Sequence, residues 1–270
     1  MTTALITGGA RGIGLALSAK LLAEGFGLLW VDRSEELLRA GREQLQASRG
    51  SVPRLQTLVC DLAEPEAAEQ VFGWSQAERE PVDLLVNNAG LGAYGLLTEI
   101  PLPRDLAVLN VNVLTLHRLT RLFLADMQRR DAGTIVNIAS VTAILPSPAF
   151  ALYSATKAFV RQYTRCLDME LRATGSQVRA ITVCPAAVRG TGFQREVGME
   201  RTGFFRGPTV TTAEEVASDI WPALRDDRRS VLTGRGLRWL LPLVRLLPTR
   251  LMLGHYRRQL QAAFGERFLS

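Results

Sequence analysis

Short apolar, β-prone runs alternate with amphipathic segments along most of this chain. The runs that predict strands are Thr3–Thr7, Gly27–Val31, Arg54–Cys60, Asp83–Asn87, Gly133–Ile138 and Gln177–Cys184. Helical patterns fill the intervals between them, so each strand is followed by a segment that can carry the chain back along the sheet. This alternation predicts an α/β fold in three layers, with a doubly wound parallel sheet covered by helices on both faces.

A glycine-rich turn follows the first predicted strand. The turn contains Gly8, Gly12 and Gly14, and its end overlaps the start of a helical pattern over Ile13–Glu24. Gly8 allows a tight turn, while Gly12 and Gly14 let backbone approach a phosphate and let helix approach sheet. The helix N-terminus offers free N–H groups and the positive end of its dipole. The sequence therefore predicts that a dinucleotide pyrophosphate binds at this turn.

An acidic residue ends the second predicted strand. Asp32 lies 18 positions after Gly14, close to the ~20 at which a ribose-binding carboxylate is expected. Ser34 is the better cap for the helix that begins at Glu35, which leaves Asp32 free for another role. A carboxylate here would accept both ribose hydroxyls of NAD and repel a 2′-phosphate. We therefore expect NAD(H) to be favoured over NADP(H) as the cofactor.

Tyr153 and Lys157 lie four residues apart in the last long helical pattern, which runs to about Thr174. This spacing places both side chains on one face of a helix. A neighbouring ammonium favours a phenolate, so Lys157 is expected to lower the pKa of Tyr153 and to make the phenol an acid or base. Lys157 is one of only two lysines among the 32 basic residues. The other interpretation of the pair is a helix-surface contact without chemistry.

Asn112 stands between Val111 and Val113 in a long amphipathic pattern from about Arg104 to Arg130. Asparagine in mid-helix usually faces solvent, so the apolar neighbours indicate that this side chain is buried for a purpose. The glycine-containing stretch 191–208 follows the sixth strand and has no clear pattern. Because ligands lie at the carboxyl ends of such strands, we expect it to form a mobile substrate lid.

Together these motifs resemble those of the short-chain dehydrogenase/reductase family over about residues 3–233. Thr7–Gly14 is similar to its Thr-Gly-x-x-x-Gly-x-Gly turn, and Asn87–Gly90 to its Asn-Asn-Ala-Gly turn. Tyr153 and Lys157 fit its Tyr-x-x-x-Lys pattern, and Ser140 precedes Tyr153 by the usual 13 residues. The resemblance implies a Rossmann fold and an NAD(P)(H)-dependent oxidoreductase that moves a hydride between nicotinamide and a secondary alcohol or ketone.

The resemblance also implies the catalytic roles. Tyr153 would be the general acid in ketone reduction and the base in alcohol oxidation. Lys157 would lower the pKa of Tyr153 and bind the nicotinamide ribose, while Ser140 would orient the substrate oxygen. Asn112 would position a water that links Lys157 to solvent, with Asn110 the less favoured choice.

Cofactor contacts follow from the same resemblance. The expected residues are Gly8, Arg11, Gly12, Ile13, Gly14, Asp32, Arg33, Asp61, Leu62, Asn88, Ala89, Gly90, Tyr153, Lys157, Pro185, Val188 and Thr191. Arg11 and Arg33 lie where related NADP enzymes place basic residues, so they oppose the inference from Asp32. The family usually has Pro-Gly after the sixth strand, whereas this chain has Pro185-Ala186. Alanine does not readily take a positive φ, so we expect a rearranged turn.

Composition excludes several other classes. The net charge is +6, but the arginines are spread along the chain, which argues against nucleic-acid binding. The three cysteines are far apart, which predicts free thiols and no metal site. No signal peptide and no run of the ~20 apolar residues needed to span a bilayer stand out, so we expect a cytoplasmic protein.

After residue 233 the resemblance fades, and we expect residues 234–270 to form a C-terminal helical extension on the single domain 1–233. Residues 236–253 are apolar with interspersed arginines. They are predicted to cover the substrate pocket and a subunit interface, to lie on an anionic membrane surface, or to pack as core. We favour a lipophilic substrate and a homodimer or homotetramer. The alternatives are a catalytically silent dinucleotide-binding regulator and a lipid carbonyl reductase at a membrane surface.

Overall fold

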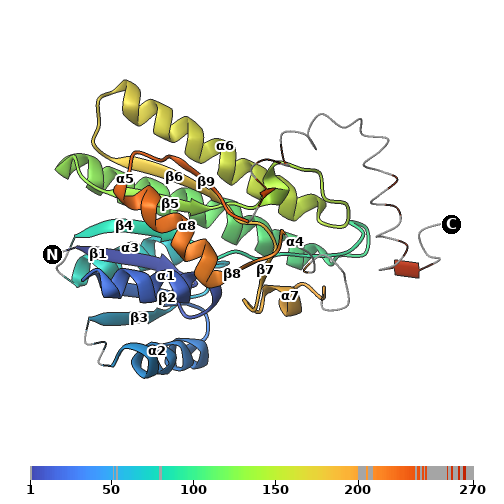
Figure 1. Ribbon diagram of the computed structural model, residues 1–270, viewed down its shortest axis with the longest axis horizontal. Coiled ribbons are helices and arrows are strands. Elements are labelled where there is room, and N and C mark those ends of the chain that lie inside the picture. Colours follow the sequence, from blue (N-terminus) through green and yellow to red (C-terminus); the bar gives the residue numbers. More distant parts are fainter. Residues whose placement is uncertain are drawn as a thin grey trace.

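A seven-stranded parallel sheet forms the centre of the computed structural model, which describes residues 2–50, 52, 54–78, 81–199, 205, 209–234, 236, 237, 239, 241, 254, 257, 261, 264 and 265 (Figure 1). Its strands are β1 (Thr3–Thr7), β2 (Gly27–Asp32), β3 (Leu55–Val59), β4 (Val82–Asn87), β5 (Thr134–Ile138), β6 (Arg179–Cys184) and β9 (Ser230–Leu232). The order is β3-β2-β1-β4-β5-β6-β9, so the winding reverses between β1 and β4. The predicted doubly wound α/β fold is confirmed, and a crevice is expected at that reversal.

Helices cover both faces of the sheet. One face carries α1 (Gly12–Ala23), α2 (Glu35–Arg49) and α8 (Ala213–Arg225), and the other carries α3 (Ala67–Ala77), α5 (Leu116–Arg130) and α6 (Ala151–Ala173). Successive strand residues point to opposite faces. Ala4 and Ile6 of β1 therefore join the first hydrophobic cluster, whereas Leu5 joins the second. Because both faces of the sheet are buried under helices, apolar residues follow one another along each strand.

The long amphipathic pattern that begins near Arg104 forms three consecutive helical segments. They are α4 (Leu102–Leu109), a π-helix (Asn110–Thr115) and α5. Asn112 lies inside the π-helix and is fully buried, as its apolar neighbours predicted. Such wide turns occur frequently at functional sites. The irregularity was not foreseen, because hydrophobic periodicity does not resolve one extra residue in a turn.

Two regions near the carboxyl ends of the strands differ from prediction. The stretch expected to be a loop contains α7 (Phe193–Glu196), and β7 (Val188–Arg189) pairs with β8 (Thr211–Thr212) in a separate small sheet. Figure 1 shows α7, β7 and β8 at the end of the sheet opposite the N-terminus. Most of the rest of the predicted lid and most of residues 236–253 lie outside the described residues.

Strand β9 was also missed by the sequence analysis. Its three residues continue the sheet beside β6, where Val183 pairs with Val231. Three residues are too few to show a periodicity. Within the described part of the chain, no helix is both long and apolar enough to cross a membrane.

Candidate active site

An open groove lies at the carboxyl ends of the central strands and encloses about 1350 Å³, including the solvent at its mouth. The predicted residues that line it are Gly8, Arg11, Gly12, Ile13, Asp32, Arg33, Asp61, Leu62, Asn88, Ala89, Gly90, Ser140, Tyr153, Lys157, Pro185, Val188 and Thr191. Gly14 and Asn112 are the predicted site residues that do not line it. The groove thus gathers residues from seven separate segments at one edge of the sheet.

The glycine turn forms one end of the groove and is braced from β4. Gly8 and Gly12 have φ values of 63° and 54°, which favour glycine. Asn88 Nδ2 donates to the carbonyls of Thr7 and Gly8, each at 2.9 Å. The Thr7 hydroxyl accepts from the backbone N–H groups of Asn88 and Ala89. These bonds hold the turn open, without side chains in the way, so its shape fits a pyrophosphate.

Gly14 packs closely against the glycine turn and does not line the groove. A Cβ atom added there would lie 2.2 Å from the Gly8 carbonyl oxygen and 2.9 Å from Asn88 Nδ2. Only a residue without a side chain lets helix α1 pass this close to the turn. The absence of a side chain at Gly14 therefore lets α1 pack directly against the glycine turn.

Asp32 lies at the carboxyl end of β2 with only 9% of its surface exposed. Burial raises the pKa of its carboxyl group, while a hydrogen bond from the Ser34 N–H and the charges of Arg11 and Arg33 oppose that rise. Ser34 caps α2 through its side chain, as expected, by accepting from Leu37 N. Asp32 is thus free to face the groove from the position predicted for a ribose-binding carboxylate.

Tyr153 and Lys157 lie on the first turns of α6; Lys157 is buried and Tyr153 is partly buried. Burial raises the pKa of the Tyr153 phenol to about 12, and a hydrogen bond with Ser140 opposes that rise. Burial lowers the pKa of the Lys157 ammonium to about 8. Lys157 Nζ lies 5.8 Å from the centre of the Tyr153 ring and donates to the Ile138 carbonyl at 2.9 Å.

The expectation that Lys157 lowers the pKa of Tyr153 is therefore wrong for this structure. Desolvation of the phenolate outweighs the other influences, because a charge buried among apolar groups loses its hydration. The effect that lowers the pKa comes from Ser140, on the loop after β5. Ser140 in turn accepts a hydrogen bond from Thr142 N at 3.2 Å, which fixes its side chain.

Asn112 lies behind the groove wall and braces the loop after β4. Its amide exchanges two hydrogen bonds with the backbone of Leu91, each 2.9 Å long, and donates a third to Thr156 Oγ1. A Cβ added at Gly90 would lie 3.0 Å from Lys157 Nζ and 3.4 Å from Asn112 Oδ1. Gly90 thus separates these two polar groups. Asn110 instead donates to Ala63 O, away from Lys157.

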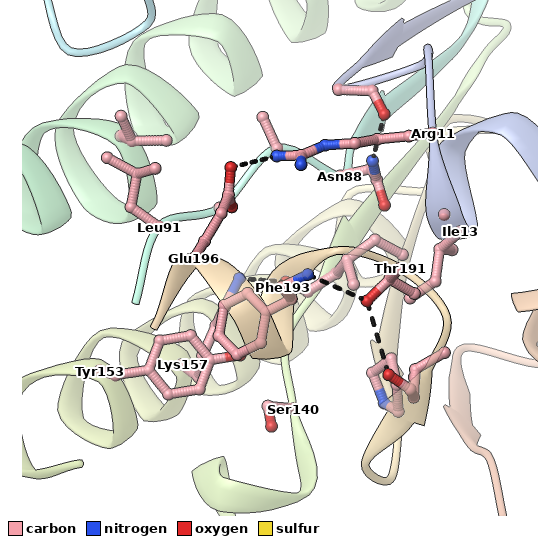
Figure 2. A pocket seen from close by; sticks show the side chains of 18 of the residues that line it. Arg11, Ile13, Asn88, Leu91, Ser140, Tyr153, Lys157, Thr191, Phe193 and Glu196 are labelled. Atoms are coloured by element: carbon pink, nitrogen blue, oxygen red, sulfur yellow. Dashed lines mark hydrogen bonds and ion pairs between the residues drawn. The ribbon is translucent and has the colours of Figure 1, made fainter. Parts of the chain in front are cut away.

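Aromatic side chains line the groove beside Tyr153. Phe193 of α7 and Phe150 both contact the Tyr153 ring, with ring centroids 5.4 Å and 5.2 Å from its centroid. Figure 2 shows Phe193 between Tyr153 and Thr191. Val197 and Met199 belong to the same buried cluster. The wall beside the candidate catalytic tyrosine is therefore apolar.

The turn after β6 is rearranged as expected. Positive φ values occur at Gly190 and Gly192, at 77° and 79°, instead of the position after Pro185. Thr191 stands between these glycines, and its Cβ would come within 3.0 Å of a Cβ added at Gly12. This close approach places the loop directly over the glycine turn.

Several groove residues escaped the sequence analysis. Those with chemical or steric consequences are Leu91, Thr142, Phe150, Phe193, Glu196 and Phe205. Glu196 forms ion pairs with both Arg11 and Arg33. No local signal marks these residues, because their role depends on how the loop after β6 folds over distant segments.

Comparison with known proteins agrees with this geometry. The sequence model of the short chain dehydrogenase family matches residues 2–202. The chain therefore belongs to the short chain dehydrogenase family of oxidoreductases. The 1-deoxy-11-beta-hydroxypentalenate dehydrogenase of Streptomyces exfoliatus is 33% identical over 228 residues, which cover 83% of this chain and 80% of the relative.

Solved structures agree with the fold over nearly the whole chain. A short-chain dehydrogenase from Sphingobium yanoikuyae in complex with NADPH is 26% identical with a TM-score of 0.77, covering 88% of this chain and 91% of that chain. A relative from Burkholderia phymatum in complex with NAD is 26% identical with a TM-score of 0.78, covering 90% and 92%. These complexes support a nicotinamide cofactor without deciding between its two forms.

Proposed function

We propose that this protein transfers a hydride between a nicotinamide dinucleotide and a secondary alcohol or ketone on a lipophilic small molecule. The observation that chiefly supports this is the meeting of Ser140, Tyr153 and Lys157 at one end of a groove whose other end is the glycine turn. A dinucleotide would extend between these two ends.

The nicotinamide supplies or accepts the hydride when the cofactor is bound. Tyr153 gives a proton to the carbonyl oxygen during reduction and takes one from the hydroxyl during oxidation. Ser140 hydrogen-bonds to the same oxygen and orients it beside the phenol. Lys157 binds the ribose, and Asn112 holds the loop at Leu91 and positions a water that links Lys157 to solvent.

The lipophilic substrate is supported by the aromatic wall at Phe150 and Phe193. Hydrophobic and aromatic walls with few polar groups are typical of sites for small apolar ligands. Here Ser140 and Tyr153 supply the convergent polar atoms. A ketone carbon flanked by bulky apolar groups would fit such a wall, whereas a highly charged substrate would not.

The preferred cofactor is proposed to be NAD(H). Asp32 supports this because its carboxylate would bind ribose hydroxyls and repel a 2′-phosphate. Asp61 and Leu62 are proposed to contact the adenine from the end of β3.

We also propose that the protein forms a homodimer or homotetramer. The exposed apolar side chains of Leu114, Phe159 and Met169 support this proposal. Light scattering after gel filtration measures the oligomeric state.

The decisive experiment measures oxidation of NADH and NADPH over a panel of apolar ketones, with the reverse reaction over the matching alcohols. Wild-type protein is expected to turn over at least one pair, and Tyr153→Phe to lose about 10²- to 10⁴-fold in kcat. Cofactor binding is measured separately by fluorescence. Binding without turnover of any pair would favour a silent regulatory protein, and unchanged kcat in Tyr153→Phe would refute the proposed role of the phenol.

A further inference from the structure

The carboxylate of Glu196 lies between two arginines at the mouth of the cofactor groove. Its Oε1 atom is 2.5 Å from an Nη2 atom of Arg11 and 3.4 Å from that of Arg33. Figure 2 shows the Glu196–Arg11 contact reaching across the groove from α7 to the glycine turn. These partners are 185 and 163 residues away in sequence. The contact is therefore a product of the tertiary fold.

The two arginines flank the residue that is proposed to bind the adenine-side ribose. Arg33 directly follows Asp32, and the charges of Arg11 and Arg33 both act on the Asp32 carboxyl. An arginine beside this position accommodates the 2′-phosphate of NADP, because guanidinium groups bind phosphate oxygens with charge-assisted hydrogen bonds. Asp32 alone therefore does not settle which cofactor the cluster prefers. Glu196 adds a second carboxylate that balances the two positive charges.

The position of Glu196 is fixed by packing at the other end of the same short segment. Phe193, three residues earlier, lies against Tyr153, and the N–H of Glu196 donates to Gly192 O at 3.1 Å. Thr191 sits over Gly12. The segment Thr191–Glu196 thus touches the glycine turn, the candidate catalytic tyrosine and the arginine pair together. Its carboxylate is held where an incoming anion would meet the arginines.

We propose that Glu196 is a cofactor-specificity residue, whose carboxylate occupies the anion position between Arg11 and Arg33 that the 2′-phosphate of NADP(H) would otherwise take. This inference rests on the proposed use of a nicotinamide dinucleotide. A 2′-phosphate must displace Glu196 and then lie close to two carboxylates. The ribose hydroxyls of NAD(H) leave the ion pairs in place. Discrimination therefore depends on Glu196 as well as on Asp32.

The test measures dissociation constants of 2′-phospho-ADP-ribose and ADP-ribose by calorimetry, since these probes differ only in the phosphate. In wild-type protein ADP-ribose is expected to bind more tightly. Glu196→Gln keeps the size of the side chain and removes its charge. The ratio of the two constants is expected to shift by roughly tenfold toward 2′-phospho-ADP-ribose. In an Arg11→Gln background the same substitution should shift the ratio by less than threefold.

The matched control is Glu69→Gln, which removes a carboxylate paired with Arg118 on the helical surface outside the groove. It should leave the ratio as in wild type. An unchanged ratio in Glu196→Gln, or an equal shift in the control, would overturn the role of Glu196 while leaving the proposed reaction intact. Failure of every variant and of wild type to bind either probe would instead refute dinucleotide binding itself.

Discussion

Phe193 of α7 lies against the ring of Tyr153, with the ring centroids 5.4 Å apart and the planes inclined by 43°. A segment that follows β6 thereby supplies one wall of the space above the candidate acid–base group. We expect Phe193→Ala to raise KM for bulky apolar ketones roughly tenfold, because an aromatic surface of this size contributes about 1–2 kcal/mol to apolar contact. The kcat value should fall less. Phe193→Leu, which keeps an apolar side chain, should retain most of the affinity; an unchanged KM in Phe193→Ala would contradict the assignment.

Burial raises the pKa of the Tyr153 phenol, and a hydrogen bond with Ser140 lowers it in part. Removing it should raise that pKa further, so the pH at which alcohol oxidation reaches half its maximal rate should move upward in Ser140→Ala. We also expect kcat to fall about 10²-fold, since the hydroxyl would no longer orient the substrate oxygen. Ser140→Thr keeps a hydroxyl and should recover part of both effects. A rate loss without a shifted pH profile would limit Ser140 to substrate positioning.

The burial of Lys157 has a consequence for stability. Its pKa falls from 10.5 to about 8 in the folded protein. Between these values the unfolded chain holds a proton that the folded chain has lost, so the free energy of unfolding rises with pH in this window. Lys157→Met should lack that contribution. From pH 8 to pH 10 the stability of wild type relative to Lys157→Met should rise by about 2 kcal/mol.

Urea unfolding of both proteins at several pH values measures this difference. Tyr153, whose pKa is raised from 10.0 to about 12, acts in the opposite direction, but only above pH 10. Tyr153 is present in both wild type and Lys157→Met, so its contribution is common to the two stability curves. Parallel stability curves from pH 8 to pH 10 would show that Lys157 is not desolvated in solution.

Gly14 and Gly73 offer a matched pair of helical glycines. A Cβ at Gly14 would overlap the Gly8 carbonyl at 2.2 Å, whereas nothing lies within 4 Å of a Cβ at Gly73 in α3. Gly14→Ala should displace the glycine turn and weaken dinucleotide binding at least tenfold. Gly73→Ala should instead raise the free energy of unfolding by about 0.5–1 kcal/mol, because alanine is the better helix former. Equal effects of the two substitutions would exclude close packing as the reason for Gly14.

Asn112 and Asn110 provide a second comparison within one π-helix. Asn112→Ala removes one buried and two partly buried hydrogen bonds, and the latter two are those that pair the Leu91 backbone, so a loss of about 2–4 kcal/mol in stability is expected. Asn110→Ala removes a single bond to Ala63 and should cost about 1 kcal/mol. Thermal unfolding and kcat should both rank Asn112→Ala as the more damaging. The reverse order in kcat would transfer the functional role to Asn110.

The local sequence predicted most strands of the sheet and the position of the glycine turn. The predicted strand Thr3–Thr7 matches the observed element at both ends, and Ser34 caps α2 as expected. Hydrophobic runs and caps are signals carried by adjacent residues, so they survive without knowledge of the tertiary structure. The π-helix around Asn112, the short helix α7 and the strand β9 were missed. Each is brief or irregular and is stabilised by distant partners.

The sequence by itself determined the family, the α/β architecture and the spacing that puts Tyr153 and Lys157 on one helical face. Only the tertiary structure decided the direction in which the pKa of each group shifts and which side chains surround it. Burial reverses the expected change in the pKa of Tyr153, and the fold brings Glu196 to Arg11 across 185 residues. Desolvation and ion pairing depend on every atom nearby in space, whereas a motif records only neighbours along the chain.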